Sequence, residues 1–276
     1  MLGYYARGTE NARLLERAEG LLERTRTEEL LGRFLPAAPA LVLDVGGASG
    51  HYAFWLAEHG YDVHLVDPVP LHVEQAERRS ATSARPLASI RQGDARTLDW
   101  PDDSAAAVLL LGPLYHLTSR DDRLSALAEA RRVIRPGGVI LAAAIARFAS
   151  ALDGLSKHLF DDPVFGQIVE RDLAEGQHRD GLPDGTRGRQ SYFTTAYLHR
   201  PEELTEELAA GGFKHEATLA VEGAAWLLQD LDEQWRDPAR RASIMAVVRA
   251  LEAEPSVLGA SSHLMGVGRK PAVGTQ

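Results

Sequence analysis

The sequence predicts an α/β fold in which helices cover a doubly wound, parallel sheet, and three observations predict it. Short apolar runs alternate with amphipathic, helix-like segments between residues 40 and 146, which is the pattern of such a sheet. The run at 105–111 is apolar on both faces, as a central parallel strand is. Carboxylates and glycines follow the ends of several runs, and such sheets bind ligands at the carboxyl ends of their strands.

The elements up to residue 146 follow from apolar spacing and from proline and glycine stops. Residues 10–35 carry leucines at helical spacings, which predicts one or two amphipathic helices that end before Pro36 and Pro39. After them we expect strands at 41–45, 62–67, 88–91, 105–111 and 139–145, and helices at 49–59, 70–83 and 119–135. The helix at 119–135 begins with acidic residues, has arginines in its last turn, and is ended by Pro136-Gly137-Gly138.

Beyond residue 146 the pattern changes. Helical pieces at 150–159 and 163–175 lead to a polar, glycine-rich stretch at 176–190, and a loop of that length in a compact domain is usually a lid. A helix from Pro201, a strand at 213–221, helices near 223–234 and 238–253 and a last strand at 261–269 complete the chain. We therefore expect a helical arm (1–39), a ligand-binding core (40–146), a helical lid segment (147–200) and a part that completes the core sheet (201–276).

The composition excludes several classes of function. The net charge is −9, so there is no basic face for a nucleic-acid partner. The chain has no cysteine, which excludes disulfides, thiolate metal sites and cysteine nucleophiles. No apolar run approaches the roughly 20 residues of a membrane span, so no membrane partner is expected. The first seven residues lack a signal-peptide pattern, and we expect a cytoplasmic protein.

A glycine-rich turn after the first strand is the feature around which the other candidate site residues are arranged. The strand at 41–45 runs into Asp44-Val45-Gly46-Gly47-Ala48-Ser49-Gly50 and then into a helix. Glycine allows a sharp turn and a close approach of the backbone to a ligand, and the helix start offers unpaired N–H groups. Asp44 is expected to brace this turn. Asp67 ends the second strand, where a carboxylate can accept hydrogen bonds from the hydroxyls of a ribose.

These residues resemble the class I S-adenosylmethionine-dependent methyltransferases, whose loop reads acidic-x-Gly-x-Gly-x-Gly. Here Ala48 stands at the middle glycine. The resemblance covers 40–146, the closing helix and strand and the last strand, and it implies a Rossmann-like, seven-stranded sheet that is mostly parallel with an antiparallel last strand. It also implies S-adenosyl-L-methionine as cofactor. The residues expected to bind the cofactor are Asp44, Gly46, Gly47, Ala48, Gly50, Asp67, Pro68, Asp94, Ala95, Leu111, Gly112 and Pro113.

By the same resemblance, the residues around the glycine turn would contact the methionine part, Asp67 the ribose, and Asp94 and Ala95 the adenine. The turn at 112–117, tyrosines near the N-terminus and the lid segment are similar to those of bacterial methyltransferases that act on small molecules. The expected activity is methyl transfer to oxygen, nitrogen or carbon of a small-molecule acceptor.

His116 is the candidate general base, because it follows the strand at 105–111 and imidazole titrates near neutral pH. It could equally cap the next helix or orient Tyr115. The tyrosines that would line a substrate cavity, or only seal the lid, are Tyr4, Tyr5, Tyr115, Tyr192 and Tyr197. His178 and His199 are weaker candidates, since a loop histidine is usually solvated. No His-x-x-x-His spacing with a carboxylate is present, so no metal is predicted.

Two alternatives stay open. A nicotinamide-dependent oxidoreductase would need Gly-x-Gly-x-x-Gly, but aligning Gly46 with the first glycine places Ala48 and His51 at the other two. A non-catalytic module that binds S-adenosylmethionine would need no substrate cavity.

Overall fold

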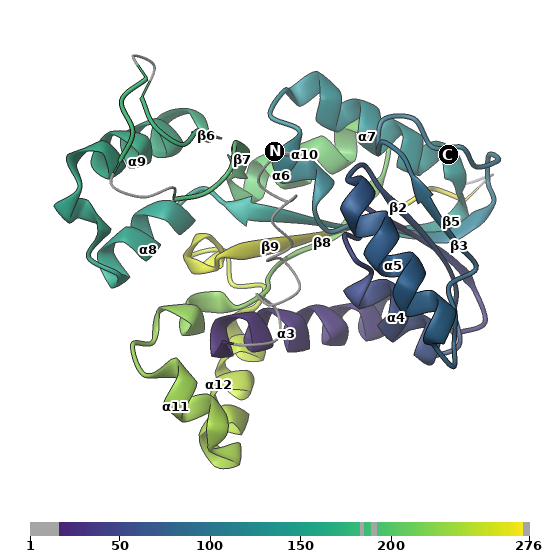
Figure 1. The fold of residues 1–276 in the computed structure, drawn as a ribbon, viewed down its shortest axis with the longest axis horizontal. Coiled ribbons are helices and arrows are strands. Elements are labelled where there is room, and N and C mark those ends of the chain that lie inside the picture. The colour runs from purple at the N-terminus through teal and green to yellow at the C-terminus, as the bar shows by residue number, and fades with distance from the viewer. Residues whose placement is uncertain (1–16, 183–184, 189–191, 273–276) are drawn as a thin grey trace.

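The structure, a computed structural model, describes residues 17–182, 185–188 and 192–272 (Figure 1). Its elements up to residue 146 are α3 (Ala18–Phe34), β1 (Leu41–Val45), α4 (His51–Glu58), β2 (Asp62–Asp67), α5 (Pro70–Thr82), β3 (Ser89–Gln92), β4 (Ala105–Leu110), α6 (Pro113–His116), α7 (Arg120–Val133) and β5 (Ile134–Ala146). The strands and helices predicted between residues 40 and 146 are therefore confirmed, with shifts at their ends.

The chain then leaves the sheet and returns to it. The segment that we proposed as a lid holds α8 (Ala149–Ser156), η1 (Leu159–Asp161), α9 (Pro163–Glu175), β6 (Gln177–His178) and β7 (Ala196–His199). The last part holds α10 (Pro201–Ala210), β8 (Lys214–Ala220), η2 (Gly223–Leu227), α11 (Leu231–Arg236), α12 (Pro238–Leu251), η3 (Leu258–Ala260) and β9 (His263–Arg269). The sequence does not predict β6 and β7, because two and four residues are too few to show an alternating pattern.

The central sheet has the strand order β3-β2-β1-β4-β5, and β9 and β8 continue it. Strands β1 to β5 pair in parallel, whereas β9 is antiparallel to both β5 and β8. This confirms the mostly parallel, seven-stranded sheet with an antiparallel last strand. β7 is added at the end of β5, where Ile145 pairs with Leu198, and β6 pairs with β7.

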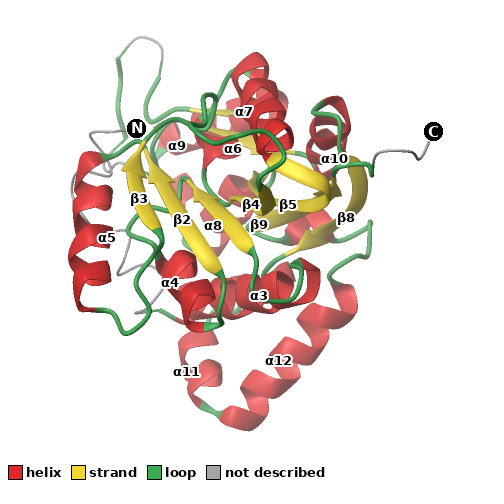
Figure 2. Cartoon of the chain, turned by 90° about the vertical axis from the view of Figure 1, so that its right-hand side faces the viewer, coloured by secondary structure: helices red, strands yellow, loops and turns green. Residues whose placement is uncertain are grey.

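Helices cover both faces of the sheet, as the buried strand residues require. On one face, Leu43, Val108 and Leu110 pack with residues of α7 and α10. On the other face, Val42 and Leu65 pack with residues of α3, α4 and α5. Figure 2 shows the strands between these two helical layers, with α11 and α12 beyond α3. In Figure 1, α8 and α9 lie to one side of the sheet.

β5 begins five residues earlier than expected. The predicted helix stop, Pro136-Gly137-Gly138, lies inside β5 (Ile134–Ala146) rather than between two elements. Gly137 has a φ of 79°, and the pairing with β4 shifts register between Ala105 and Ala107. The turn is therefore a bulge, in which extra residues bend a strand without ending it.

Proline fixes the start of five of the described helices, because its φ already suits a first helical turn. It stands there in α5, α6, α9, α10 and α12. In two of these helices an aspartate also accepts a backbone N–H, from Val164 to Asp162 at 3.0 Å and from Ala239 to Asp237 at 2.8 Å, which caps the helix. None of the helices in the described ranges is both long enough and apolar enough to cross a membrane.

Candidate active site

The glycine turn after β1 folds tightly against two other parts of the core. Gly46 has a φ of 72°, and a Cβ there would lie 2.7 Å from the side chain of Pro113. A Cβ on Gly47 would lie 2.4 Å from Oδ2 of Asp44. Only glycine therefore fits at these two positions, and the backbone of the turn is left open toward the ligand side.

Asp67, at the end of β2, braces this turn. Its Oδ2 accepts the N–H of Ala48 at 2.9 Å, and its Oδ1 accepts the N–H of Val69 at 2.9 Å. Ala48 has a φ of 49°, which is uncommon for a residue with a Cβ. The hydrogen bond to Asp67 holds the backbone in this conformation, so the Asp67 carboxylate fixes the shape of the turn.

Asp44 does not brace the turn, and this expectation is wrong for the residues that the structure describes. The side chain is buried, and neither of its carboxylate oxygens has a hydrogen-bond partner among these residues. Burial and the nearby Asp67 carboxylate raise the pKa of Asp44 to about 7. A buried carboxylate of this kind is costly unless a positive group comes to it.

The loops after β1, β2, β3 and β4 line one cavity together with Glu23 of α3, and we call it the cofactor cavity. The expected cofactor-binding residues that line it are Asp44, Gly46, Gly47, Ala48, Asp67, Pro68, Asp94, Ala95, Leu111, Gly112 and Pro113. Gly50 is not among the lining residues, and a Cβ there would point at the core side chains of Leu65 and Phe54, 3.0 and 3.1 Å away. The carboxylates at the ends of neighbouring strands thus converge on one hollow, as the strand order requires.

The cofactor cavity is also lined by residues that the sequence did not single out. Ser49, Tyr52 and His72 belong to it, and His72 Nδ1 lies 3.0 Å from Asp67 Oδ1. Glu23 belongs to it from a helix outside the core pattern. Ser49 stands inside the glycine turn and could have been included on that signal, whereas nothing in the sequence around Glu23 indicates a ligand.

His116 lies in α6 and also lines the cofactor cavity. Burial lowers its pKa to about 4, and the Thr195 backbone opposes this shift only in part. The imidazole is therefore neutral near pH 7. Its ring packs edge-on against the ring of its neighbour in the sequence, Tyr115, with the centroids 4.6 Å apart.

A second, larger cavity of about 510 Å³ lies beside the first, and we call it the acceptor cavity after the role that we propose for it below. Its aromatic lining residues are Tyr115, Phe165, Tyr192, Phe193 and Trp226. Glu23 and Tyr115 line both cavities, so the two hollows meet at these side chains. Of the tyrosines expected at a substrate, Tyr115 and Tyr192 line the acceptor cavity, and Tyr4 and Tyr5 lie outside the described residues.

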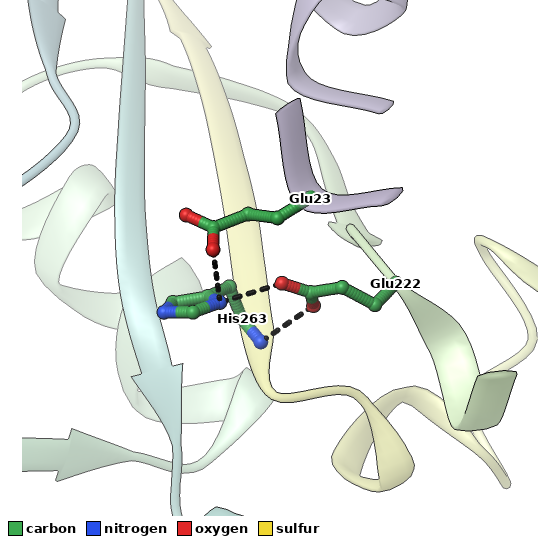
Figure 3. Close-up of side chains that lie close together, drawn as sticks. All are labelled: Glu23, Glu222 and His263. Carbon is green, nitrogen blue, oxygen red and sulfur yellow. Dashed lines mark hydrogen bonds and ion pairs between the residues drawn. The ribbon is translucent and has the colours of Figure 1, made fainter. Parts of the chain in front are cut away.

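Glu23, Glu222 and His263 form a cluster on the wall of the acceptor cavity (Figure 3). They come from α3, from the segment after β8 and from the start of β9. One ligand atom of each lies within 4.8 Å of the others, so the three could hold a metal ion. The sequence did not predict this cluster, since its members are about 40 to about 240 residues apart.

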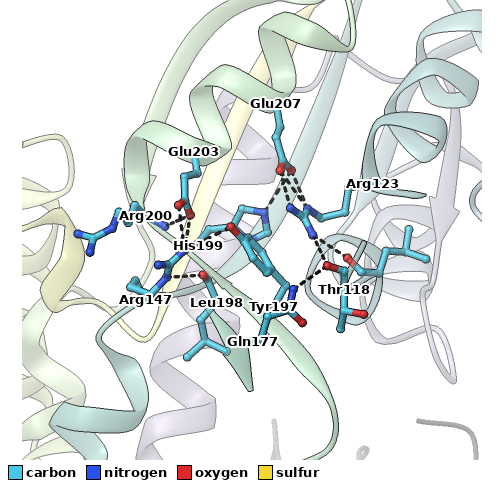
Figure 4. Close-up of polar contacts among 11 residues, drawn as sticks. Thr118, Arg123, Arg147, Gln177, Tyr197, Leu198, His199, Arg200, Glu203 and Glu207 are labelled. Carbon is cyan, nitrogen blue, oxygen red and sulfur yellow. Dashed lines mark hydrogen bonds and ion pairs between the residues drawn. The ribbon is translucent and has the colours of Figure 1, made fainter. Parts of the chain in front are cut away.

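A buried ion-pair network holds the proposed lid segment against the core (Figure 4). Arg123 of α7 donates to both carboxylate oxygens of Glu207 at 2.7 to 3.1 Å, and His199 Nε2 lies 3.3 Å from Glu207. Burial alone would raise the pKa of Glu207, but hydrogen bonds from His199 and Arg123 lower it to about 2. The guanidinium of Arg123 also lies 3.8 Å from the centroid of the Tyr197 ring. Tyr197 thus belongs to this network and is not among the residues that line either cavity.

The two loop histidines are not solvated, contrary to expectation. His199 is fully buried in the network, and His178 is 4% exposed with its Nδ1 2.7 Å from Asp172 Oδ2. A short strand places each of them, β7 for His199 and β6 for His178. Because the sequence did not predict these two strands, it also did not predict that the two histidines are buried.

Comparisons with known proteins agree with this arrangement. The family described as "Methyltransferase domain" matches residues 42–138. An uncharacterized methyltransferase of Mycobacterium bovis is 30% identical over 188 residues, which cover 67% of this chain and 68% of that protein. An S-adenosyl-L-methionine-dependent Diels-Alderase of Talaromyces variabilis is 34% identical over 140 residues, 49% of this chain and 45% of that protein.

Solved structures of methyltransferases have a similar fold. A crystal structure of a methyltransferase from Methanosarcina mazei superposes with a TM-score of 0.60 at 14% identity, over 88% of this chain and 97% of that one. The comparisons favour S-adenosylmethionine over the nicotinamide cofactor that the sequence left open. With its glycine turn, its strand-end carboxylates and its sheet, the chain belongs to the class I S-adenosylmethionine-dependent methyltransferases.

Proposed function

We propose that this methyltransferase acts on a small molecule that binds in the acceptor cavity and offers an oxygen, nitrogen or carbon atom to the methyl group. The observation that carries the proposal is the contact between the two cavities at Glu23 and Tyr115. A cavity of about 510 Å³ with aromatic walls and a few polar groups has the size and character of a small-molecule site.

The residues of the cofactor cavity fit S-adenosylmethionine, which supplies an electrophilic methyl group on a sulfonium when bound. The buried Asp44 carboxylate has no hydrogen-bond partner among the described residues, and the ammonium of the methionine part would supply the missing positive charge. Asp67 already accepts two backbone N–H groups, and a carboxylate can accept further bonds from ribose hydroxyls. Asp94 and Ala95 would hold the adenine side, and Gly112 and Pro113 the opposite wall.

His116 remains our proposal from the sequence for a general base. It is neutral near pH 7, since burial lowers its pKa to about 4, and a neutral imidazole can accept a proton. A base of that pKa is weak, so its contribution near neutral pH is small. Tyr115 and Tyr192 would contact the acceptor, and the segment at 147–200 would exclude water and select the acceptor.

The proposal is tested by blocking the acceptor cavity. Ala149 lines this cavity, and its substitution Ala149→Trp would fill part of it. The matched control is Ala209→Trp, on the exposed side of α10. We expect turnover of phenol and arylamine probes, followed by release of S-adenosylhomocysteine, to fall at least about tenfold in Ala149→Trp because the acceptor is misplaced. Binding of S-adenosylhomocysteine, measured by calorimetry, should stay the same in both variants.

Two results would contradict the proposal. One is full activity of Ala149→Trp with every probe that the parent protein methylates. The other is tight binding of S-adenosylhomocysteine by a protein that releases none of it from S-adenosylmethionine with any probe, as a non-catalytic module would. For His116, the pH–rate profiles of His116→Ala and the parent are compared, and identical profiles would remove His116 from the chemistry.

A further inference from the structure

We propose that His178, held in place by Asp172, binds a hydroxyl group of the acceptor, so that this methyltransferase selects hydroxylated aromatic acceptors. The inference rests on the proposed function and adds to it the class of acceptor and the side chain that recognises it. It starts from two polar atoms of residues that line the acceptor cavity, neither of which has a hydrogen-bond partner among the described residues.

His178 belongs to the wall of the acceptor cavity and has one ring nitrogen unpaired. It lines this cavity and is 4% exposed. Its Nδ1 lies 2.7 Å from Oδ2 of Asp172, whereas its Nε2 is buried and has no hydrogen-bond partner in the described ranges. A buried polar atom without a partner costs free energy. A ligand that supplies the missing hydrogen bond is therefore favoured over one that does not.

A second polar atom of the same cavity is in the same state. Ser150 lies in α8 and lines the acceptor cavity. Its hydroxyl oxygen is buried and likewise has no hydrogen-bond partner within the part of the chain that the structure describes. Neither His178 nor Ser150 is among the residues that line the cofactor cavity. The two unpaired atoms therefore indicate a ligand with polar groups in the acceptor cavity, and not the cofactor.

A glycine turn brings His178 back to Asp172. Asp172 lies in α9 and is fully buried. The helix ends at Gly176, which has a φ of 73°, and a Cβ there would lie 2.6 Å from the carbonyl oxygen of Leu198, so only glycine fits. β6 begins at the next residue. The imidazole of His178 therefore lies against the helix that carries its carboxylate partner.

The backbone on both sides of His178 is held as well. Arg171 precedes Asp172 in α9, and its guanidinium donates to the carbonyl oxygen of Gln177 at 3.0 Å and to that of Arg179. These bonds fix the backbone around His178, and the Asp172 carboxylate fixes the orientation of its ring. A group that is fixed before the ligand arrives loses little freedom on binding, which suits a residue that positions the acceptor.

A hydroxyl is the group that suits Nε2 of His178. A ring nitrogen accepts a hydrogen bond when it carries no proton and donates one when it does, and a hydroxyl can pair with it in both cases, since it is both donor and acceptor. The assignment therefore does not depend on the protonation of the ring. Because His178 lines the acceptor cavity and is not among the residues of the cofactor cavity, we assign it an anchoring hydroxyl rather than the atom that attacks the methyl group.

The side chains near His178 favour a planar, aromatic acceptor. Phe193 lines the same cavity, and its ring lies edge-on to the imidazole with the centroids 5.9 Å apart. Tyr192 and Trp226 line this cavity as well. Aromatic side chains pack well against flat rings, and a few polar groups among them fix the orientation of a ligand. The acceptor cavity therefore suits an aromatic ring that carries a hydroxyl.

The experiment compares two probes of nearly the same shape, naphthol with a hydroxyl and methylnaphthalene with a methyl group in its place. Their affinities for the protein saturated with S-adenosylhomocysteine are measured by equilibrium dialysis. We expect the parent protein to bind naphthol about tenfold more tightly, as for one hydrogen bond to a buried group. In His178→Phe the two affinities should become nearly equal. Because the ratio compares two ligands on one protein, a general loosening of the structure does not imitate this result.

Three further variants serve as second test, control and competitor. His178→Phe leaves Asp172 buried without its partner, which costs stability, so the double variant Asp172→Leu/His178→Phe is measured as well and should show the same loss of preference. His215→Phe is the matched control, because His215 lies in β8 and is not among the residues that line either cavity. It should keep the preference of the parent. Ser150→Ala removes the competing polar atom and should keep most of it.

A preference for naphthol that persists in both His178 variants would overturn the inference. A parent protein that binds the two probes equally, or binds neither, would overturn it too, and a loss of preference in Ser150→Ala alone would assign the hydroxyl to Ser150. The proposed function fails separately. If the preference depends on His178 but the protein releases no S-adenosylhomocysteine from S-adenosylmethionine with any probe, the chain recognises hydroxylated aromatic ligands without methylating them.

Discussion

The cofactor cavity and the acceptor cavity are built in different ways. The first is lined almost entirely by four consecutive loops at the ends of β1 to β4, with Glu23 as the addition from elsewhere. The second takes residues from α3, β5, the segment at 147–200 and the regions around 222 and 263. One cavity follows from local turns on a regular sheet, and the other exists only when distant parts of the chain meet.

The two cavities also differ in what holds their walls. Backbone conformation shapes the cofactor side, where Gly46, Gly47 and Ala48 allow a turn that Asp67 fixes. Packing between distant elements holds the acceptor side, where the buried Arg123–Glu207 pair contacts His199 and Tyr197 at the end of the lid segment. Substitutions beside the cofactor cavity should therefore weaken cofactor binding. Substitutions beside the acceptor cavity should instead lower stability and change which acceptor is bound.

The largest effect is expected for Arg123→Met. It leaves Glu207 buried without its guanidinium, and breaking such a pair costs about 3 to 5 kcal/mol of unfolding free energy. Urea denaturation measures this change. The control is Arg78→Met, since Arg78 pairs with Glu74 on the exposed face of α5 and should cost less than about 1 kcal/mol. Equal losses in the two variants would mean that burial does not make the Arg123–Glu207 pair more important for stability than an exposed pair.

The next effect is expected for Gly47→Ala. The new Cβ would lie 2.4 Å from Asp44 Oδ2, and relieving such overpacking costs about 1 to 3 kcal/mol. Because the turn would move away from the ligand, affinity for S-adenosylhomocysteine should fall roughly ten- to a hundredfold. Calorimetry at constant pH measures the loss. Wild-type affinity in this variant would show that the turn does not approach the cofactor.

The pH dependence of cofactor binding gives a smaller effect. The pKa of Asp44 is about 7 in the cofactor-free protein, chiefly because of burial, and a bound ammonium would favour its charged form. Affinity for S-adenosylhomocysteine should therefore be constant well above pH 7 and fall about tenfold per unit below it. The variant Asp44→Asn should bind S-adenosylhomocysteine weakly, and its affinity should depend little on pH, because position 44 no longer titrates. A parent profile that is flat between pH 6 and 8 would rule out the ion pair.

Asp44→Asn should also change stability without cofactor. Burial raises the pKa of Asp44 in the folded protein above that of an ordinary aspartate, to about 7. Ionisation of Asp44 therefore destabilises the fold progressively as pH rises from about 4 to 7, and the cost is complete above pH 7. The variant removes that cost and should gain on the order of 2 kcal/mol of unfolding free energy at pH 8. Thermal denaturation at pH 5 and pH 8 checks the sign, and a gain of equal size at both pH values would argue against it.

The smallest effect is expected for Gly32→Ala, outside both cavities. Gly32 lies in α3, and a Cβ there would meet no atom within 4 Å. Alanine favours a helix over glycine by up to about 1 kcal/mol, so the variant should be slightly more stable and should bind S-adenosylhomocysteine unchanged. It serves as the matched control for Gly47→Ala. A loss of affinity here would mean that any added methyl group disturbs the cofactor cavity.

The sequence sufficed where short-range patterns decide the structure. Apolar runs placed the strands of the core, and the residues after them, such as Asp67 and Asp94, were assigned to one edge because parallel strands share it. The sequence did not decide what each residue at that edge does. Asp67 accepts backbone N–H groups and Asp44 accepts none, which only the fold of the turn determines. Gly50 belongs to the motif but does not line the cavity.

What only the tertiary structure decided is which distant side chains meet. The carboxylates of Glu23 and Glu222 reach His263 because α3 passes near the end of β8 and the start of β9. His178 and His199 are buried because two very short strands attach the lid segment to β5. Local patterns specify strands, turns and strand ends, since these depend on neighbouring residues, whereas an acceptor cavity depends on packing between elements that no sequence period connects.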